Sequence, residues 1–176
     1  VSTVHFRDDR WCRPASGGEP ELCYPAAASA VTRVVFVDDP ADPRDGEILE
    51  ADIEINAVDF TLAIDPVGPG SLDLRGVATH EIGHALGLAH NCGTGTEAWP
   101  ADHAGNMVPG CDGATAVVTA ATMYFEVSPG DTKLRTLEAS DRAAVCSVTG
   151  GSLCNTVTTG GCATGGAPGI ALAAIL

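Results

Sequence analysis

The sequence is poor in basic residues, and this scarcity excludes one class of partner. Lysine and arginine together number 9, against 23 aspartate and glutamate residues, which gives a formal net charge of −14 at pH 7. A surface of this charge repels the phosphate backbone of nucleic acids. We therefore expect no nucleic-acid partner. The low lysine content also fits an extracellular protein.

Long apolar runs are absent as well. A transmembrane helix needs about 20 consecutive apolar residues, and the tail-like run over 170–176 is far shorter. The first residues show no charged region followed by an apolar one, so no secretory signal is visible and a secreted protein would be a mature or trimmed form. The 176 residues are 45% hydrophobic, which suffices for one domain. We expect a monomer without a membrane span.

The cysteines lack the C-x-x-C spacing that is typical of structural zinc sites and thioredoxin-like redox sites. All 7 lie in segments rich in Gly, Pro and Asp, a distribution that favours disulfides in an oxidising compartment. We therefore expect a secreted or cell-surface protein. Six cysteines allow about fifteen disulfide connectivities. Proximity along the chain suggests three disulfides that leave Cys162 over: Cys12–Cys23, Cys92–Cys111 and Cys146–Cys154.

Three segments have the pattern of β-strands. Residues 1–11 alternate between polar and apolar, with Val4 and Phe6 expected to face a core. Residues 31–37 are apolar and β-branched, which predicts a strand. The strict alternation around 53–57 predicts a half-buried strand that pairs with 31–37.

Two helices and a tail follow. Ser71 or Asp73 is expected to cap a helix that ends at Gly87, and a second helix is expected from 136 to 146. Beyond Thr149 the chain is rich in Gly, Thr and Ala, which predicts a low-complexity tail that packs poorly. The expected apolar face of the first helix comprises Val77, Ala78, Ile82, Ala85 and Leu86.

The segment H-E-I-G-H-A-L-G-L-A-H, from His80 to His90, carries the expected chemistry. Residues four apart share a helix face, so His80 and His84 present two imidazoles to one cation. Gly87 lets the chain leave the helix with a positive φ, and His90 then returns to the same metal. A bare H-E-x-x-H arises by accident fairly often. This longer motif fixes five positions and uses three of the 5 histidines.

Three imidazoles and one open position are typical of a catalytic zinc site, whereas structural sites are closed by four protein ligands. Glu81, next to the first ligand, is expected to take a proton from the zinc-bound water and pass it to the leaving amine. Two alternatives stay open: a binding module whose zinc site is vestigial, and a zinc hydrolase that acts on non-peptide substrates. A structural site has no use for a general base at Glu81, which favours an enzyme.

The extended motif resembles the zinc-binding consensus of metzincin metallopeptidases. These enzymes also carry a methionine turn, and A-A-T-M-Y-F resembles the matrixin form, with Met123 and Tyr124; Met107 in A-G-N-M-V-P is the second choice. The upstream segments resemble bacterial matrixin-like proteins, and the resemblance covers roughly residues 30–148. It implies an α/β metzincin catalytic domain: a twisted, mixed and mostly parallel sheet with an antiparallel edge strand, an active-site helix and a C-terminal helix.

The resemblance also implies a function and a substrate. The chain would be a secreted zinc-dependent endopeptidase whose extended peptide or protein substrate pairs with the edge strand, residues 30–38. Three departures accompany it. The second, structural zinc of vertebrate matrixins lacks its ligands, since only His5 and His103 remain, and Phe125 replaces the proline of the turn. The expected catalytic domain over 1–149 also has too little sequence for the strand and long helix that usually precede the hairpin, so either the N-terminus was removed or the fold is reduced.

Two further segments suggest ligands or processing. The acidic turn could supply oxygen ligands to calcium, although a solvated turn explains it equally well; its carboxylates are Asp38, Asp39, Asp42, Asp45 and Glu47. The tail over 150–176 partly resembles the start of a C-terminal sorting signal of myxobacterial surface proteins, in which a cysteine, here Cys162, is processed. An ordinary frayed terminus is the alternative.

Overall fold

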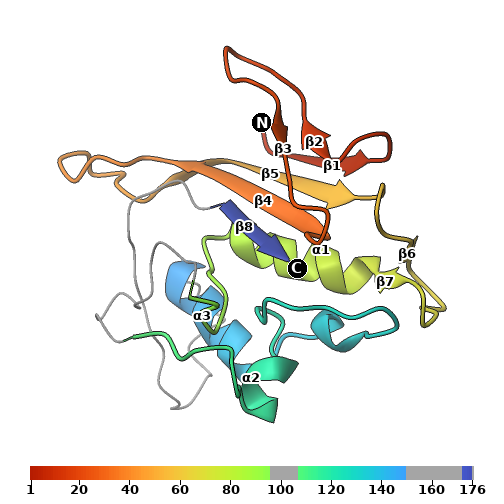
Figure 1. Cartoon of the computed structure of the whole chain (residues 1–176). Helices are drawn as coiled ribbons and strands as arrows, with labels where there is room; N and C mark the ends of the chain where they lie inside the picture. Colours follow the sequence, from red (N-terminus) through yellow and green to blue (C-terminus); the bar gives the residue numbers. More distant parts are fainter. Residues whose placement is uncertain (96–106, 150–171, 176) are drawn as a thin grey trace.

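The computed structural model describes residues 1–95 and 107–149 and the backbone of 172–175 (Figure 1). The elements in chain order are β1 (Thr3–Arg7), β2 (Cys12–Arg13), β3 (Leu22–Cys23), β4 (Ala30–Phe36), β5 (Ile48–Asn56), β6 (Leu62–Ala63), β7 (Leu72–Asp73), α1 (Leu74–Ala85), α2 (Ala116–Ala120), the 3₁₀ turn η1 (Lys133–Arg135), α3 (Ala139–Thr149) and β8 (Leu172–Ile175).

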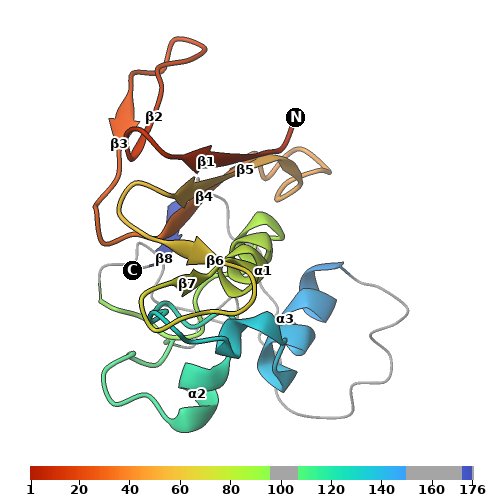
Figure 2. The same cartoon turned by 90° about the vertical axis from the view of Figure 1, so that its right-hand side faces the viewer.

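The main sheet is mixed and open, with the strand order β1-β5-β4-β8. β1 runs parallel to β5, whereas the β5–β4 and β4–β8 pairs are antiparallel. The sheet lies on one side of α1, and α2 and α3 lie on the other side (Figures 1 and 2). A mixed α/β fold is therefore confirmed, but the expectation of a mostly parallel sheet is wrong for the described strands. In the described part of the chain, no helix is both long and apolar enough to cross a bilayer.

β4 does not lie at the edge of the sheet. β8 pairs with it antiparallel over four positions, from Arg33 opposite Leu172 to Ala30 opposite Ile175. The expectation of a free edge is therefore wrong over 30–33. The tail was expected to pack poorly, whereas the backbone of 172–175 is paired with β4. The hydrophobic pattern of the sequence does not predict β8. A strand of four apolar residues has too little pattern of its own, and it forms because β4 is beside it.

β1 buries little of its apolar side. Val4 and Phe6 remain 57% and 52% exposed, so the expectation that they face a core is wrong. Both lie opposite the isoleucines of β5, Ile53 and Ile55, which are buried. Register partners in a parallel pair share a sheet face, but β1 is the outermost strand and α1 packs against β5 and β4 instead.

β5 is buried on both faces in its second half, which the expectation of a half-buried strand did not anticipate. Glu54 is 2% exposed and forms an ion pair with Arg7 of β1. The amide of Asn56 donates to the Ala28 carbonyl at 3.0 Å and to Asp59. These partners satisfy polar groups that would otherwise be costly to bury.

The disulfides expected near the N-terminus and in the loop after α1 are confirmed. Cys12–Cys23 joins paired positions of β2 and β3, and Cys92–Cys111 closes the second loop. Cys146 of α3 is also disulfide-bonded. Its expected partner Cys154, like Cys162 and His103, lies outside the described residues.

α1 begins where the sequence predicts. Asp73 is its N-cap, and the Asp73 carboxylate accepts hydrogen bonds from the backbone N–H groups of Arg75 and Gly76. The expected apolar face is only partly buried, because Ile82 and Leu86 are 52% and 39% exposed. The main hydrophobic core joins the sheet, α1 and the segment around η1, and it comprises Ala30, Ile53, Ile55, Leu72, Val77, Val127 and Leu134.

The α1 cap generates a first prediction. The Asp73 carboxylate is 1% exposed and also binds the Arg135 guanidinium through two hydrogen bonds, at 2.7 and 2.9 Å. Asp73→Ala removes the cap and the partner of Arg135, so we expect the free energy of unfolding to fall by about 2–4 kcal/mol. Urea denaturation measures it. Glu21→Ala, which breaks the exposed pair with Arg10, is the matched control and should cost at most about 1 kcal/mol. Equal losses for the two variants would contradict this role of Asp73.

Candidate metal centre

Three histidine side chains converge beside the end of α1. The Nε2 atom of His80 lies 2.8 Å from that of His84 and 3.3 Å from that of His90, and the last two atoms are 3.2 Å apart. His80 and His84 are one helical turn apart, so they share a face of α1. Gly87 has φ +90°, a conformation that favours glycine, and the chain turns back there to bring His90 to the other two.

The opposite ring nitrogens of two of these histidines are anchored to carbonyl groups. Nδ1 of His80 lies 2.6 Å from the Thr122 carbonyl oxygen, and Nδ1 of His84 lies 2.7 Å from that of Leu88. A carbonyl only accepts, so each Nδ1 carries the proton and donates it. The Nε2 lone pairs are then left for a metal, the arrangement that is usual for histidine ligands.

The triad fits a zinc ion. Its donor atoms all lie within 4.8 Å of one another, so the group could hold a metal. Zinc–nitrogen bonds of about 2.0–2.1 Å in a tetrahedron place the nitrogens about 3.3–3.4 Å apart. Two of the three separations, 3.2 and 3.3 Å, are close to this value, and the third, 2.8 Å, is shorter.

Burial keeps the two helix histidines neutral. Desolvation lowers the pKa of His84 to about 3, with a smaller contribution from His90. Desolvation, followed by the neighbouring imidazoles, also lowers the pKa of His80 well below its usual value. Neutral imidazole is the form that binds zinc, so no proton competes with the metal at these two ligands near neutral pH.

Glu81 is buried beside the triad and has one unused oxygen. Its carboxylate is fully buried, and the Thr32 hydroxyl of β4 donates a hydrogen bond to Oε2. Among the described residues, no hydrogen-bond donor contacts Oε1. Desolvation raises the pKa of Glu81 to about 8, although the Thr32 hydrogen bond acts in the opposite direction. A bound cation would favour the charged carboxylate.

Met123 lies against α1, where the sequence places the methionine turn. It is 3% exposed, whereas the second candidate, Met107, is 71% exposed. A Cβ atom built on Gly83 of α1 would lie 2.3 Å from the Met123 sulfur. Gly83 occupies one of the two variable positions of H-E-x-x-H. Because it has no side chain, Met123 can pack directly against α1.

The backbone of the methionine turn is held by Asp141 of α3. Its buried carboxylate accepts hydrogen bonds from the backbone N–H groups of Thr122, Met123 and Glu138, at 2.8, 3.2 and 2.8 Å. The carbonyl of the same Thr122 anchors His80. Asp141 therefore positions a candidate metal ligand that it does not touch. α3 spans 139–149, three residues later than expected.

Tyr124 belongs to a buried cluster beside the second disulfide. Its ring is 8% exposed and packs with the Cys92–Cys111 disulfide, and Lys133 Nζ lies 5.3 Å from the ring centroid. The ring centroid of Phe125 lies 5.0 Å from that of Tyr124 and 6.4 Å from that of His90. The contacts of Tyr124 are those of a structural side chain.

The acidic turn does not form a common ligand set in the described part of the chain, where the groups of three or more potential ligands are the histidine triad and a group that includes the Cys12–Cys23 disulfide. Asp39 and Asp45 accept backbone hydrogen bonds within the turn, and Asp42 pairs with Arg44. Asp38 has no such role among these contacts. The calcium prediction gains no support from this geometry.

Three residues of the site were not anticipated from the sequence: Thr32, Gly83 and Asp141. Thr32 stands alone as a polar residue on the buried side of an apolar strand, which is the signal that could have singled it out. Asp141 lies in the first turn of a helix, a position typical of structural carboxylates. Neither signal predicts which residue Thr32 or Asp141 contacts in the fold.

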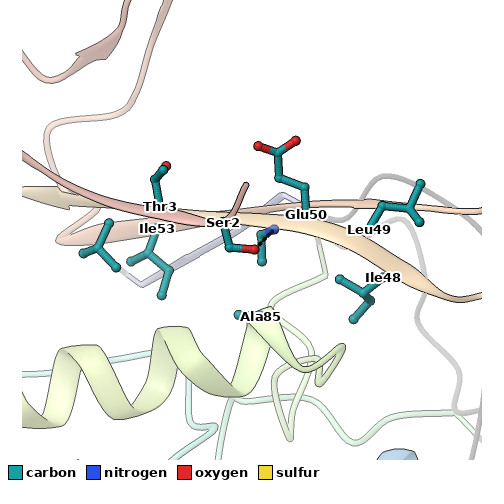
Figure 3. Close-up of a pocket in the computed structure, with 9 residues that line it drawn as sticks. Ser2, Thr3, Ile48, Leu49, Glu50, Ile53 and Ala85 are labelled. Atoms are coloured by element: carbon teal, nitrogen blue, oxygen red, sulfur yellow. Dashed lines mark hydrogen bonds between the residues drawn. The ribbon is translucent and has the colours of Figure 1, made fainter.

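A separate hollow lies between β1, β5 and the end of α1 (Figure 3). Ile48 and Ala85 point into it from opposite sides, and Ser2 and Ile53 lie along its sheet side. Its lining includes none of the three histidines and not Glu81.

Comparisons with protein-family models, with curated proteins and with solved structures found no match.

The contact between Gly83 and Met123 generates a second prediction. Alanine is normally about 1 kcal/mol better than glycine inside a helix. At Gly83 the added methyl group meets the Met123 sulfur, so we expect Gly83→Ala to lower the free energy of unfolding by about 1–3 kcal/mol and to weaken zinc binding. Gly70→Ala, where a Cβ meets nothing within 4 Å, is the control. Stabilisation by Gly83→Ala would show that Met123 moves aside freely.

The burial of Glu81 generates a third prediction. Its pKa in the folded, metal-free protein is about 8, above its ordinary value of 4.5, so the folded state holds a proton that the unfolded state has lost. Its contribution to stability is therefore full below pH 4.5 and is lost as the pH rises toward 8, by at most about 1.4 kcal/mol per pH unit. Glu81→Gln should stabilise the metal-free protein more at pH 8 than at pH 5. Urea denaturation with a chelator present measures this, and a pH-independent difference would contradict it.

Proposed function

We propose that this chain is a zinc-dependent endopeptidase. One arrangement carries the proposal: three histidine Nε2 atoms converge on one point, and the residue after the first histidine is a buried glutamate with a free carboxylate oxygen. A metal site with a purely structural role is usually closed by four protein ligands and gains nothing from such a carboxylate. We also propose that the chain is related to the metzincins, whose zinc-binding motif it resembles.

His80, His84 and His90 would hold the zinc ion. When bound, zinc supplies a Lewis acid that polarises the scissile carbonyl and makes water more acidic. Glu81 takes a proton from the attacking water at Oε1, while the Thr32 hydroxyl holds Oε2 in place. The carbon–oxygen bond forms, the carbon–nitrogen bond breaks, and Glu81 returns the proton to the leaving nitrogen.

The outer edge of β4 favours a peptide substrate. An extended chain pairs with this edge antiparallel in β8, so its N–H and C=O groups suit a peptide backbone. Thr32 belongs to the same strand and contacts Glu81, so a peptide on β4 would lie near the general base. This supports a peptide substrate over a non-peptide one.

The cysteines support a secreted or cell-surface location. Cys12–Cys23 and Cys92–Cys111 are disulfides, and such bonds persist in oxidising compartments. Their placement in loops around the sheet and the methionine turn is typical of structural bridges.

One observation favours a second candidate, a zinc-binding module without catalysis. Glu81 and Thr32 are both fully buried, and β8 covers the strand edge beside them. A site closed in this way binds metal without admitting substrate.

Substituting Glu81 separates the two candidates and is the fourth prediction. Glu81→Gln keeps the shape of the side chain but cannot take a proton, so we expect cleavage of a quenched peptide library to fall about 1,000-fold, or ~4 kcal/mol of barrier. Zinc content, measured by atomic emission, should stay at one ion per chain. Glu126→Gln, at an exposed position beyond the methionine turn, is the control and should retain activity.

Two outcomes would contradict parts of this proposal. Activity that survives Glu81→Gln excludes the proposed base. Zinc-loaded protein that cleaves no peptide under any condition, with β8 displaced as described below, favours the binding module.

A further inference from the structure

We propose that strand β8 of this chain occupies the peptide-binding edge of β4, so that the protein's own segment 172–175 competes with the substrate. This inference rests on the proposed function, which it deepens by naming an occupant of the substrate's edge.

The first step is the pairing itself. β8 pairs with four of the seven β4 residues, from Ala30 to Arg33. Within the described residues, no strand pairs with the last three on that side. The other edge of β4 is taken up by β5, with which it pairs along its whole length. A strand has two edges, so the edge that β8 covers is the only one left for an added peptide.

The second step is the position of β8 relative to the candidate base. Ala173 lies opposite Thr32, and the Thr32 hydroxyl donates to the Glu81 carboxylate and to the Glu81 carbonyl oxygen, the latter at 3.2 Å. β8 is thus centred on the part of β4 that contacts the general base. In Figure 1 it lies along β4 on the side away from β5, above α1.

The third step is exclusion. One row of backbone N–H and C=O groups pairs with one strand at a time, so a substrate that binds over 30–33 must displace β8. Because β8 belongs to the same chain, its pairing with β4 is intramolecular and does not depend on the protein concentration. A peptide substrate must exceed that competition, and the effect on kinetics is a raised KM with an unchanged chemical step.

The test displaces β8 in the full-length, zinc-loaded protein. Of two adjacent strand residues, only one directs its N–H toward the partner strand. Ala173→Pro together with Ala174→Pro therefore removes one hydrogen bond to β4, whichever of the two residues donates it. The matched control is Ala173→Val with Ala174→Val, which favours a strand at the same positions. Should the proline variant fail to retain one zinc per chain, Ala173→Gly with Ala174→Gly weakens the strand more gently.

Two readouts are compared. We expect amide hydrogen exchange over 30–36 to become faster in the proline variant and to stay slow in the valine control. We expect KM for a quenched peptide to fall about tenfold or more in the proline variant, with kcat nearly constant, as removal of a tethered competitor requires.

Each other outcome overturns the inference. Unchanged exchange over 30–36 means that β8 does not cover β4 in solution. Faster exchange with unchanged KM means that substrate does not use this edge, and then the endopeptidase itself still stands.

Absence of cleavage in every variant contradicts the proposed function but leaves the inference testable. Binding of a labelled Leu-Ala-Ala-Ile peptide is then measured by fluorescence anisotropy. Saturable binding to the proline variant and none to the valine control supports the inference, whereas equal binding, or none, overturns it.

Discussion

The structure depends on satisfying three polar side chains that α1 buries, His80, Glu81 and His84. Buried polar groups are costly unless each finds a hydrogen-bond partner. The partners come from three directions: a hydroxyl of the sheet at Thr32, a carbonyl just after the helix, and a carbonyl of the methionine turn at Thr122. The sheet, the loop after α1 and the turn must therefore close around the helix together.

The backbone of the methionine turn connects α3 to the candidate metal centre. Asp141 binds two consecutive N–H groups of the turn, and Thr122, which supplies one of them, offers its carbonyl to His80. On the helix side, the absence of a side chain at Gly83 brings Met123 against the turn of α1 between the two histidines. A shift of α3 would thus be transmitted to the orientation of one imidazole, although α3 carries no ligand.

The sequence predicted what is encoded locally. The histidine spacing, the break at Gly87, the Asp73 cap and the two short disulfide loops each depend on residues that are close along the chain. The hydrogen-bond partners of Glu81 and of the methionine turn could not be predicted from the sequence. Thr32 lies 49 residues from Glu81, and Asp141 lies 19 residues from Thr122. Burial failed where it depends on neighbours: α1 lies under β5 and β4 rather than under the outer strand β1, so apolar residues of β1 stay exposed.

If the chain is the proposed endopeptidase, some contact around the buried Glu81 must open for a substrate to enter. Moving the methionine turn would break the Asp141 hydrogen bonds and release His80, and moving β4 would break its pairing with β5 and remove Thr32 from Glu81. Both changes leave buried polar groups unsatisfied. Separating β8 from β4 breaks the pairing of four positions, and the freed backbone groups of β4 can pair with the incoming peptide in the same way. Under the proposed function, exchange of one strand for another at this edge is the change that leaves the histidines, Glu81 and their anchors in place.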